Sequence, residues 1–210
     1  MLISLALFAA APIASAPIAS APGEPITAEC TFEREAVLAT DFVPFDQTEG
    51  EGWRPLYDAG CYIEAANILR DWQARNLSQL SPDSPRERHF RRTLAWHEAQ
   101  MWAFGGRNDV ALPIFERTYG GSENASDIAH NRYVDGTIAF LKRDRDGLDT
   151  AIAALAATPK PSGWNKAVGA DGAPIYMTWP LNLDVLQGLR RCWDEPYKTA
   201  YLCREIRKPR

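Results

Sequence analysis

The stretch SPRERHFRRTLAWHEAQMWAFGG, residues 84–106, contains the signals that begin and end one long helix. Ser84 can cap the first turn, proline follows at the first helical position, and Glu87 completes a capping box. The closing pair of glycines supplies the residue type that tolerates a left-handed stop. These signals predict a helix that begins at Pro85 and ends near Phe104.

Helix signals continue on both sides of this segment, whereas strand signals are poor, because no sustained polar/apolar alternation and no Asn-Gly turn occurs. A Pro- and Gly-rich stretch, residues 158–178, is expected to be irregular. We expect Asn108 to cap one helix, Asn124 or Ser126 to cap the next, and Asp146-Gly147 to form a turn. The chain is therefore predicted to be all-α, with further helices at residues 53–59, 61–76, 109–119, about 125–142, 148–157, 182–193 and 197–207.

A repeated frame of a turn, an alanine and a larger apolar residue runs through these helices. Gly60-x-Tyr62-x-Glu64-Ala65-x3-Leu69 resembles the turn and second helix of a tetratricopeptide repeat. Fainter copies are Gly106-x4-Ala111-x3-Phe115 and Asp146-x4-Ala151-x3-Leu155, at wider spacing than the roughly 34 residues of that family. The resemblance covers about residues 53–157 and implies stacked antiparallel helical hairpins; an unrelated helical bundle is the alternative.

The start of the chain has the order of a secretory signal peptide. Residues 1–21 contain no charged side chain, and an apolar run is followed by two A-x-A triplets of small residues. The run is shorter than the roughly 20 apolar residues that span a bilayer. A disordered Ala/Pro leader is the alternative, because no lysine or arginine precedes Arg34. We expect an exported protein, periplasmic or secreted, with no membrane span after cleavage.

Three regions are expected to follow this signal peptide. Residues 22–52 form an N-terminal extension, and residues 53–157 form the repeat-like helical region. Residues 158–210 hold the irregular loop and a C-terminal helical hairpin that packs on the same domain. About 185 residues are enough for one domain with its own core.

The four cysteines are expected to form disulfides in an oxidising compartment. Four cysteines allow three pairings. Their grouping along the chain favours two local bridges, Cys30–Cys61 and Cys192–Cys203. A zinc site is the weaker alternative, because the sequence has no C-x-x-C and no histidine close to any cysteine.

No catalytic residue, metal site or cofactor is predicted. His97-Glu98 begins like the helix of a zinc protease, but Met101 occupies the position of the second histidine. The aspartate-rich turn at residues 144–149 lacks the first and last ligands of a calcium loop. Four acidic residues of the extension could supply an acid/base pair, although acidic loop residues are usually solvated: Asp41, Asp46, Glu49 and Glu51.

The predicted function is non-catalytic binding of a protein or peptide partner, because helical repeats offer a continuous concave surface. The net charge of −4 argues against a nucleic-acid binder, and we interpret the basic cluster at residues 86–92 as solvated surface. The seven tryptophans fall mostly at helical core spacing. The resemblance implies that the first helix of each hairpin lines a groove, with five candidate binding residues: Arg92, Trp96, Gln100, Tyr133 and Phe140.

The alternative is an envelope enzyme, or an accessory to one, whose site forms where residues 158–180 meet the helices. A deep pocket with convergent polar groups near that loop, such as Asp171 with His130, would distinguish it from a binding protein.

We predict that the protein purified from its host is shorter than the 210-residue chain by about the length of the leader. The reason is that signal peptidase cuts after small residues such as those that end the apolar run. Intact-mass measurement tests this, and recovery of the full-length chain in the cytoplasm would refute it.

Overall fold

The structure of the protein is a computed structural model that describes residues 30–79, 84–121, 124–164 and 177–204. These residues form helices joined by short connections, and no strand occurs among them. The all-α prediction is therefore confirmed. None of the helices in this described part is long and apolar enough to cross a membrane.

The elements follow one another as short and long helices. In chain order they are α1 (Arg34–Leu38), a π-helical turn η2 (Val43–Gln47), α2 (Arg54–Asp58), α3 (Tyr62–Asn76), a 3-10 turn η3 (Leu77–Gln79), α4 (Pro85–Phe104), α5 (Asn108–Phe115), a 3-10 turn η4 (Glu116–Thr118), α6 (Ala125–Leu141), α7 (Arg145–Ala156), α8 (Leu183–Arg191) and α9 (Tyr197–Leu202).

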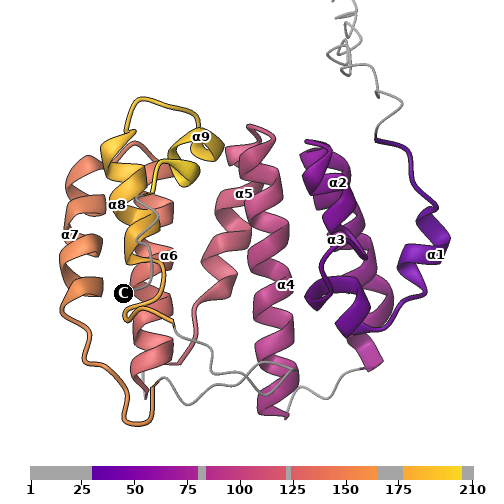
Figure 1. The fold of residues 1–210 in the computed structure, drawn as a ribbon, viewed down its shortest axis with the longest axis horizontal. Coiled ribbons are helices and arrows are strands. Elements are labelled where there is room, and N and C mark those ends of the chain that lie inside the picture. Colours follow the sequence, from indigo (N-terminus) through magenta and orange to yellow (C-terminus); the bar gives the residue numbers. More distant parts are fainter. Residues whose placement is uncertain (1–29, 80–83, 122–123, 165–176, 205–210) are drawn as a thin grey trace, which may run out of the picture.

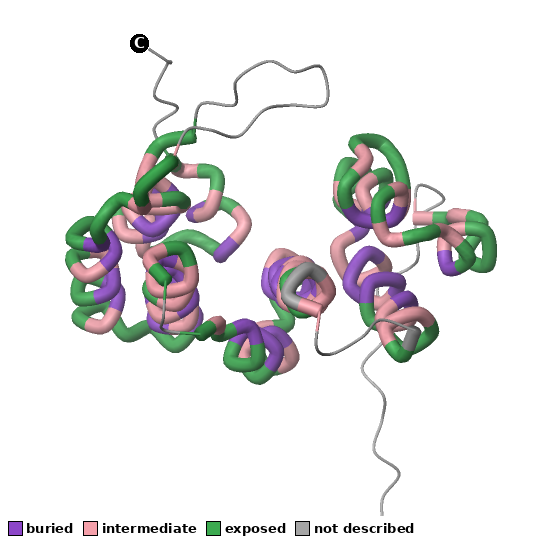
Figure 2. Tube along the Cα trace, turned by 90° about the horizontal axis from the view of Figure 1, so that it is seen from below, coloured by how far each residue is buried: buried purple, intermediate pink, exposed green. Residues whose placement is uncertain are grey.

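Helices that are consecutive in sequence pack side by side. α3 packs against α4, α4 against α5, and α6 against α7, while α8 lies against α6 and α7 and α9 reaches back to α4. Figure 1 shows α4 near the middle of this row, and Figure 2 shows the same row from below. The fold thus consists of packed helical hairpins, and the resemblance to tetratricopeptide repeats stays a prediction.

The helix α4 begins and ends where its sequence signals place it. The Ser84 hydroxyl accepts a hydrogen bond from the backbone N–H of Glu87 at 3.4 Å, as the capping box requires. Gly106 has a φ of +77°, a left-handed conformation that most side chains disfavour. Between these ends, the helix buries three apolar residues almost completely: Leu94, Ala99 and Met101.

Two predicted helix starts are corrected. Asn108 is itself the first residue of α5, and it follows an N-cap that makes no side-chain hydrogen bond. α7 begins at Arg145 because the Asp144 carboxylate accepts a hydrogen bond from the Gly147 N–H at 2.9 Å. The pair Asp146-Gly147 therefore lies inside the first helical turn and does not form a separate turn.

The N-terminal extension is part of the core from residue 30 onward. Phe45 is fully buried and stacks on Trp72, with ring centroids 4.6 Å apart. The Trp72 indole N–H donates to the Thr40 carbonyl at 2.9 Å. This extension also contains two short helical elements, α1 and η2, that the sequence analysis did not predict.

We expected the acidic residues of the extension to be solvated, and Asp46 differs most clearly from this expectation. Its side chain is 0 % exposed, and its Oδ1 accepts hydrogen bonds from Trp53 Nε1 at 3.0 Å and from His97 Nδ1 at 2.7 Å. Burial raises the pKa of Asp46, but the hydrogen bonds from His97, Trp53 and Gln47 outweigh burial and hold the pKa below its ordinary value. This carboxylate joins the extension to α4.

Replacement of Ala65 by leucine should lower the free energy of unfolding by about 1–3 kcal/mol, because overpacking a tight core forces neighbours off their preferred rotamers. Ala65 is 0 % exposed on α3. Ala74 is exposed on the same helix, so Ala74→Leu serves as the control and should leave stability nearly unchanged. Urea denaturation of both variants measures the difference. Equal stabilities would contradict close packing at Ala65.

Candidate functional site

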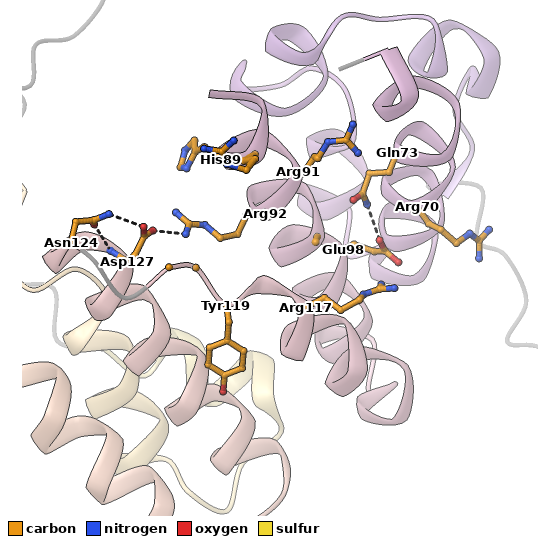
Figure 3. Close-up of a pocket in the computed structure, with 14 residues that line it drawn as sticks. Arg70, Gln73, His89, Arg91, Arg92, Glu98, Arg117, Tyr119, Asn124 and Asp127 are labelled. Carbon is orange, nitrogen blue, oxygen red and sulfur yellow. Dashed lines mark hydrogen bonds and ion pairs between the residues drawn. The ribbon is translucent and has the colours of Figure 1, made fainter. Parts of the chain in front are cut away.

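The described part of the protein contains a basic cavity of about 1140 Å³. Its walls come from α3, α4, the segment that follows α5 and the start of α6 (Figure 3). Five arginines, one histidine and two carboxylates line it: Arg70, Arg88, Arg91, Arg92, Arg117, His89, Glu98 and Asp127. We call this hollow the basic cavity.

The cavity exists because two neighbouring helices differ in length. α4 has 20 residues and α5 has 8, which correspond to about 30 Å and 12 Å at 1.5 Å per residue. α5 starts beside the C-terminal end of α4 and runs back along it, so it covers only that end. The N-terminal half of α4 is left facing the start of α6 across the hollow.

Residues of the basic cluster form one stripe on this uncovered half of α4. Arg88, Arg91, Arg92 and Ala95 are separated by steps that place them on the same side of a helix, and all four line the cavity. Arg91 and Arg92 are partly buried. These two arginines are therefore less exposed than the solvated surface that we expected, because they line the hollow.

Arg92 is held in place by a carboxylate on α6. Its Nη1 lies 2.5 Å from Oδ1 of Asp127, whose Oδ2 accepts a hydrogen bond from the Asn124 amide at 2.7 Å. Asn124 also caps α6, as one of the two predicted caps, by accepting from the Asp127 N–H at 2.8 Å. Burial raises the pKa of Asp127, but these contacts with Arg92 and Asn124 bring it below the ordinary value.

Gly120 makes room for this ion pair. A Cβ atom built at Gly120 would overlap the Arg92 guanidinium and crowd the Asp127 carboxylate. The Gly120 N–H donates to the side-chain oxygen of Asn131 at 2.7 Å, which holds the glycine segment against α6. Because Gly120 has no side chain, the Arg92–Asp127 ion pair can lie close to the backbone at this position.

At the other end of the stripe, Glu98 is a buried carboxylate with arginines around it. Its side chain accepts a hydrogen bond from Gln73 Nε2 at 2.7 Å, and the residue is 6 % exposed. Burial raises the pKa of Glu98, and the Gln73 contact and the charges of Arg117 and Arg70 offset only part of that increase. Glu98 therefore cancels some of the positive charge at this end.

Two histidines close to Arg92, His89 and His130, have lowered pKa values. Burial lowers the pKa of His89, and the nearby charge of Arg92 lowers it further. His130 donates from Nε2 to the Thr118 carbonyl at 2.9 Å. Burial, followed by the charge of Arg92, lowers the pKa of His130 to about 4. In both histidines burial is the larger cause, and the charge of Arg92 adds to it.

Four of the five predicted groove residues lie in the core. Trp96, Gln100, Tyr133 and Phe140 are at most 8 % exposed. Trp96 packs on Tyr133 with ring centroids 4.6 Å apart. These side chains are buried because α4 is covered by α3, α5 and α9, and α6 by α5, α7 and α8. Arg92 is the one member of the predicted set that lines the basic cavity.

The residues proposed for the alternative enzyme site are not brought together in the described part of the protein. Asp171 lies outside the described residues, so its relation to His130 is not part of this structure. A second hollow of about 480 Å³ adjoins residues 177–184, where Arg204 and Asp184 are 4.0 Å apart. His130 donates to the Thr118 carbonyl and is not among the residues that line either hollow.

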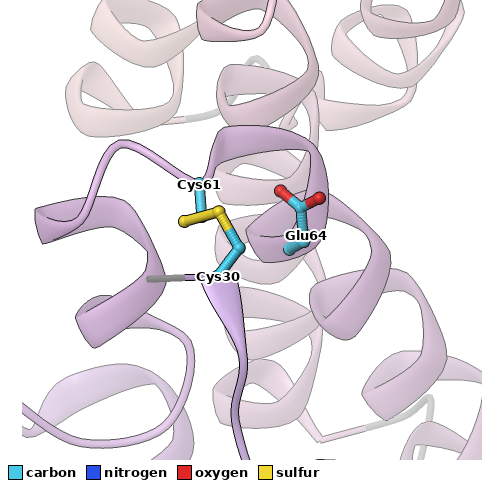
Figure 4. A group of neighbouring side chains, drawn as sticks. All are labelled: Cys30, Cys61 and Glu64. Atoms are coloured by element: carbon cyan, nitrogen blue, oxygen red, sulfur yellow. A yellow bond between two sulfur atoms is a disulfide. The ribbon is translucent and has the colours of Figure 1, made fainter. Parts of the chain in front are cut away.

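The cysteines pair as predicted, Cys30 with Cys61 and Cys192 with Cys203. Figure 4 shows the first bridge beside Glu64, whose carboxylate comes within 4.8 Å of both sulfur atoms. Metal ligation by cysteine needs the thiolate, which a disulfide does not provide. This group therefore ties the extension to the start of α3 and does not supply metal ligands in the disulfide form.

Comparison with known proteins finds no matching family model, no matching curated protein and no matching solved structure. The chemistry of the basic cavity is consequently the basis for any functional inference.

His130 should make the protein less stable as the pH falls from 6.5 toward 4. The unfolded chain binds a proton at this histidine near pH 6.5, whereas the folded protein does so only near pH 4. The loss should reach about 3 kcal/mol across this window. His130→Gln keeps an N–H donor for Thr118 but removes the titration, so its stability should fall less.

Urea denaturation of the wild type and His130→Gln at pH 7, 5.5 and 4 measures this difference. Asp46 and Asp127 have lowered pKa values, so their stabilisation is lost mainly below the ordinary value of 3.8, beneath the window of His130. If both proteins lose the same stability between pH 6.5 and 4, His130 is not kept neutral in the folded state.

Proposed function

We propose that the protein is exported and acts as a non-catalytic binding protein that holds a protein or peptide partner in the basic cavity. The observation that carries this proposal is the convergence of five arginines from three parts of the chain on one hollow. Arginine is enriched at protein interfaces, where its planar guanidinium offers several N–H donors at once.

Export is supported by the disulfides together with the apolar leader. Structural disulfides persist in oxidising compartments and are rare in the cytosol. Both pairs are in bonding contact, and no cysteine in the described part is left without a partner.

The size of the cavity favours a segment of a larger partner over a small molecule. Small-molecule clefts usually enclose about 300–1,000 Å³, and this cavity, at about 1140 Å³, is larger. Tyr119 stands at its edge, 43 % exposed, with its hydroxyl donating to Asp135 at 2.8 Å. Tyrosine and arginine are the residue types that dominate binding energy in many interfaces.

The lining suits recognition better than proton transfer. Arginine stays protonated in proteins, so five of the nine charged or titratable lining groups cannot act as acids or bases near pH 7. The Asp127 carboxylate already binds Arg92, and Glu98 binds Gln73. What the cavity offers a ligand is therefore mainly positive charge and N–H donors.

A partner held in this cavity should be retained by the wild-type protein and lost when two lining arginines are reversed in charge. The test is to immobilise the full exported chain, incubate it with envelope extract from its host, and compare the recovered proteins with those on Arg88→Glu/Arg117→Glu. Arg190→Glu is the control, because Arg190 lies on α8 and pairs with Asp149 outside the cavity. Circular dichroism establishes that each variant is folded.

A protein recovered in equal amounts on all three baits does not bind the cavity. If every recovered protein behaves in this way, the proposed function is refuted. Loss from the double variant alone, with retention on the control, is the expected result.

A further inference from the structure

The first disulfide lies beside a carboxylate at the start of α3. Cys61 immediately precedes α3, and Glu64 follows it by three residues, so the two side chains lie on one face of the first helical turn. Cys30 reaches the same place from the extension, 31 residues earlier in the chain. The two sulfur atoms and a carboxylate oxygen all lie within 4.8 Å of one another, as Figure 4 shows.

The disulfide offers the Glu64 carboxylate no partner. A disulfide sulfur carries no proton, so it cannot donate a hydrogen bond to the carboxylate oxygens. Within the described part of the protein, the Glu64 side chain forms no hydrogen bond or ion pair with another residue. It is only partly buried, so solvent can reach the group. The position of this carboxylate is therefore not explained by an interaction in the oxidised form.

The chemistry of the group changes when the bond between the cysteines is reduced. A dithiol reductant transfers two electrons and two protons to the Cys30–Cys61 bond, which yields two thiols and the disulfide of the reductant. A Zn²⁺ ion can then displace both thiol protons and bind the two thiolates together with the Glu64 carboxylate. Thiolate and carboxylate are ordinary zinc ligands, and three protein ligands leave the fourth tetrahedral position to water.

The spacing of the three donor atoms suits such an ion. Zinc lies about 2.3 Å from a cysteine sulfur and about 2.0–2.2 Å from a carboxylate oxygen, so tetrahedral ligands of these types are roughly 3.5–3.8 Å apart. The donor atoms already lie within 4.8 Å of one another, and the Cα atoms of the two cysteines are 5.5 Å apart. Side-chain rotation can therefore bring the donors to a zinc ion without a change of the backbone.

Contacts other than the disulfide hold the segment that carries Cys30 on the helical core. Phe32 packs against the buried core two residues after Cys30. Four residues after Cys30, α1 begins and packs on α3, where Arg34 Nη2 lies 2.6 Å from Asp71 Oδ2. Because these contacts do not involve the sulfur atoms, the reduced chain keeps Cys30 close to the start of α3.

We propose that the reduced protein binds one Zn²⁺ ion through Cys30, Cys61 and Glu64, and that this ion replaces the disulfide as the tie between the extension and α3. The proposed site is separate from the basic cavity and adds to the binding of a partner. The start of α3 favours the thiolates, because the N-terminus of a helix stabilises negative charge. The extension therefore stays attached in both redox forms.

The second cysteine pair provides an internal comparison. Among the described residues, no histidine, aspartate or glutamate joins Cys192 and Cys203 to form a group of three ligands. Two thiolates alone complete less of a tetrahedral site than two thiolates with a carboxylate. This pair should therefore bind zinc more weakly than the first pair when both are reduced.

The test compares the full exported chain in its oxidised form and after reduction by a phosphine, which is itself converted to the phosphine oxide and adds no thiol. Calorimetric titration with zinc chloride should show no tight site in the oxidised protein and a single tight site per chain in the reduced protein. Binding should release about two protons per ion near pH 7, because both thiols lose their protons. Titrations in buffers of different ionisation enthalpy measure this release.

Cysteine variants assign the site to the first pair. Cys30→Ser/Cys61→Ser should bind zinc at least about 100-fold more weakly than the reduced wild type, because two of three ligands are lost. Cys192→Ser/Cys203→Ser should keep the tight site. Circular dichroism shows whether each protein is helical before zinc is added.

The carboxylate ligand is tested by Glu64→Gln, which keeps the size of the side chain and removes its charge. This variant should weaken zinc binding on the order of tenfold, since an amide is a poorer zinc ligand than a carboxylate. The oxidised form of the variant keeps its disulfide and should unfold at the same temperature as the wild type, so weaker zinc binding cannot be ascribed to damage. Glu195→Gln is the matched control, because Glu195 is exposed and lies beside the second pair.

Thermal unfolding supplies a readout that does not depend on calorimetry. Zinc binds the folded site, so it should raise the unfolding temperature of the reduced wild type and leave that of Cys30→Ser/Cys61→Ser unchanged. If reduction alone unfolds the chain, zinc should restore its helical circular dichroism.

Three results overturn the proposal. The first is zinc binding of equal strength by the oxidised and reduced proteins, or by the reduced wild type and Cys30→Ser/Cys61→Ser. The second is a Glu64→Gln variant that binds zinc as the wild type does, because the third ligand is then wrong. The third is a reduced chain that zinc neither stabilises nor refolds.

Discussion

The difference in length between α4 and α5 is the constraint on which the site depends. A helix of 20 residues presents an apolar face to α3 along one side, but its other neighbour ends after 8 residues and a short 3-10 turn. The C-terminal half of α4 is therefore enclosed and apolar, with Ala99 and Met101 almost without exposure. The N-terminal half is enclosed on one side only, and the arginines of α4 are concentrated there. The cavity therefore begins on the N-terminal half of α4 and reaches Glu98, next to the buried core residues Ala99 and Met101.

Charged side chains also hold the parts of this arrangement together. Asp46 is fully buried, which is costly for a carboxylate unless hydrogen bonds replace its water. Its bonds to Trp53 and His97 supply that replacement and attach the extension to α4. On the opposite side, the pair of Arg92 with Asp127 links α4 to α6 at the cavity. Both links are partly or fully shielded from solvent, so removing one partner of either would leave the other without its compensating contact in a shielded place.

Much of the helical layout could be predicted, because its signals are local. The Ser84 cap, the glycine at position 106 and the proline at position 196 act within a turn of the chain, so the starts of α4 and α9 and the end of α4 follow from neighbouring residues alone. The cysteine pairs were predictable for the same reason of proximity. The π-helical turn at Val43–Gln47 was not, because it depends on burial of Phe45 and Asp46 against residues further along the chain.

The sequence by itself determined that this chain is helical, where α4 begins and ends, and that arginines gather in the first turns of α4. Only the tertiary structure decided which helix faces are covered. The resemblance to tetratricopeptide repeats implied that Trp96 and Tyr133 line a groove, yet both are buried because a helix in the middle of a row is contacted from several sides. Arg91 and Arg92 read as solvated surface, yet they line a cavity because α5 is too short to reach them and α6 brings Asp127 across the gap. The periodicity of a sequence shows that a helix has an apolar and a polar face. Which face is covered in the fold depends on the lengths and positions of the neighbouring helices.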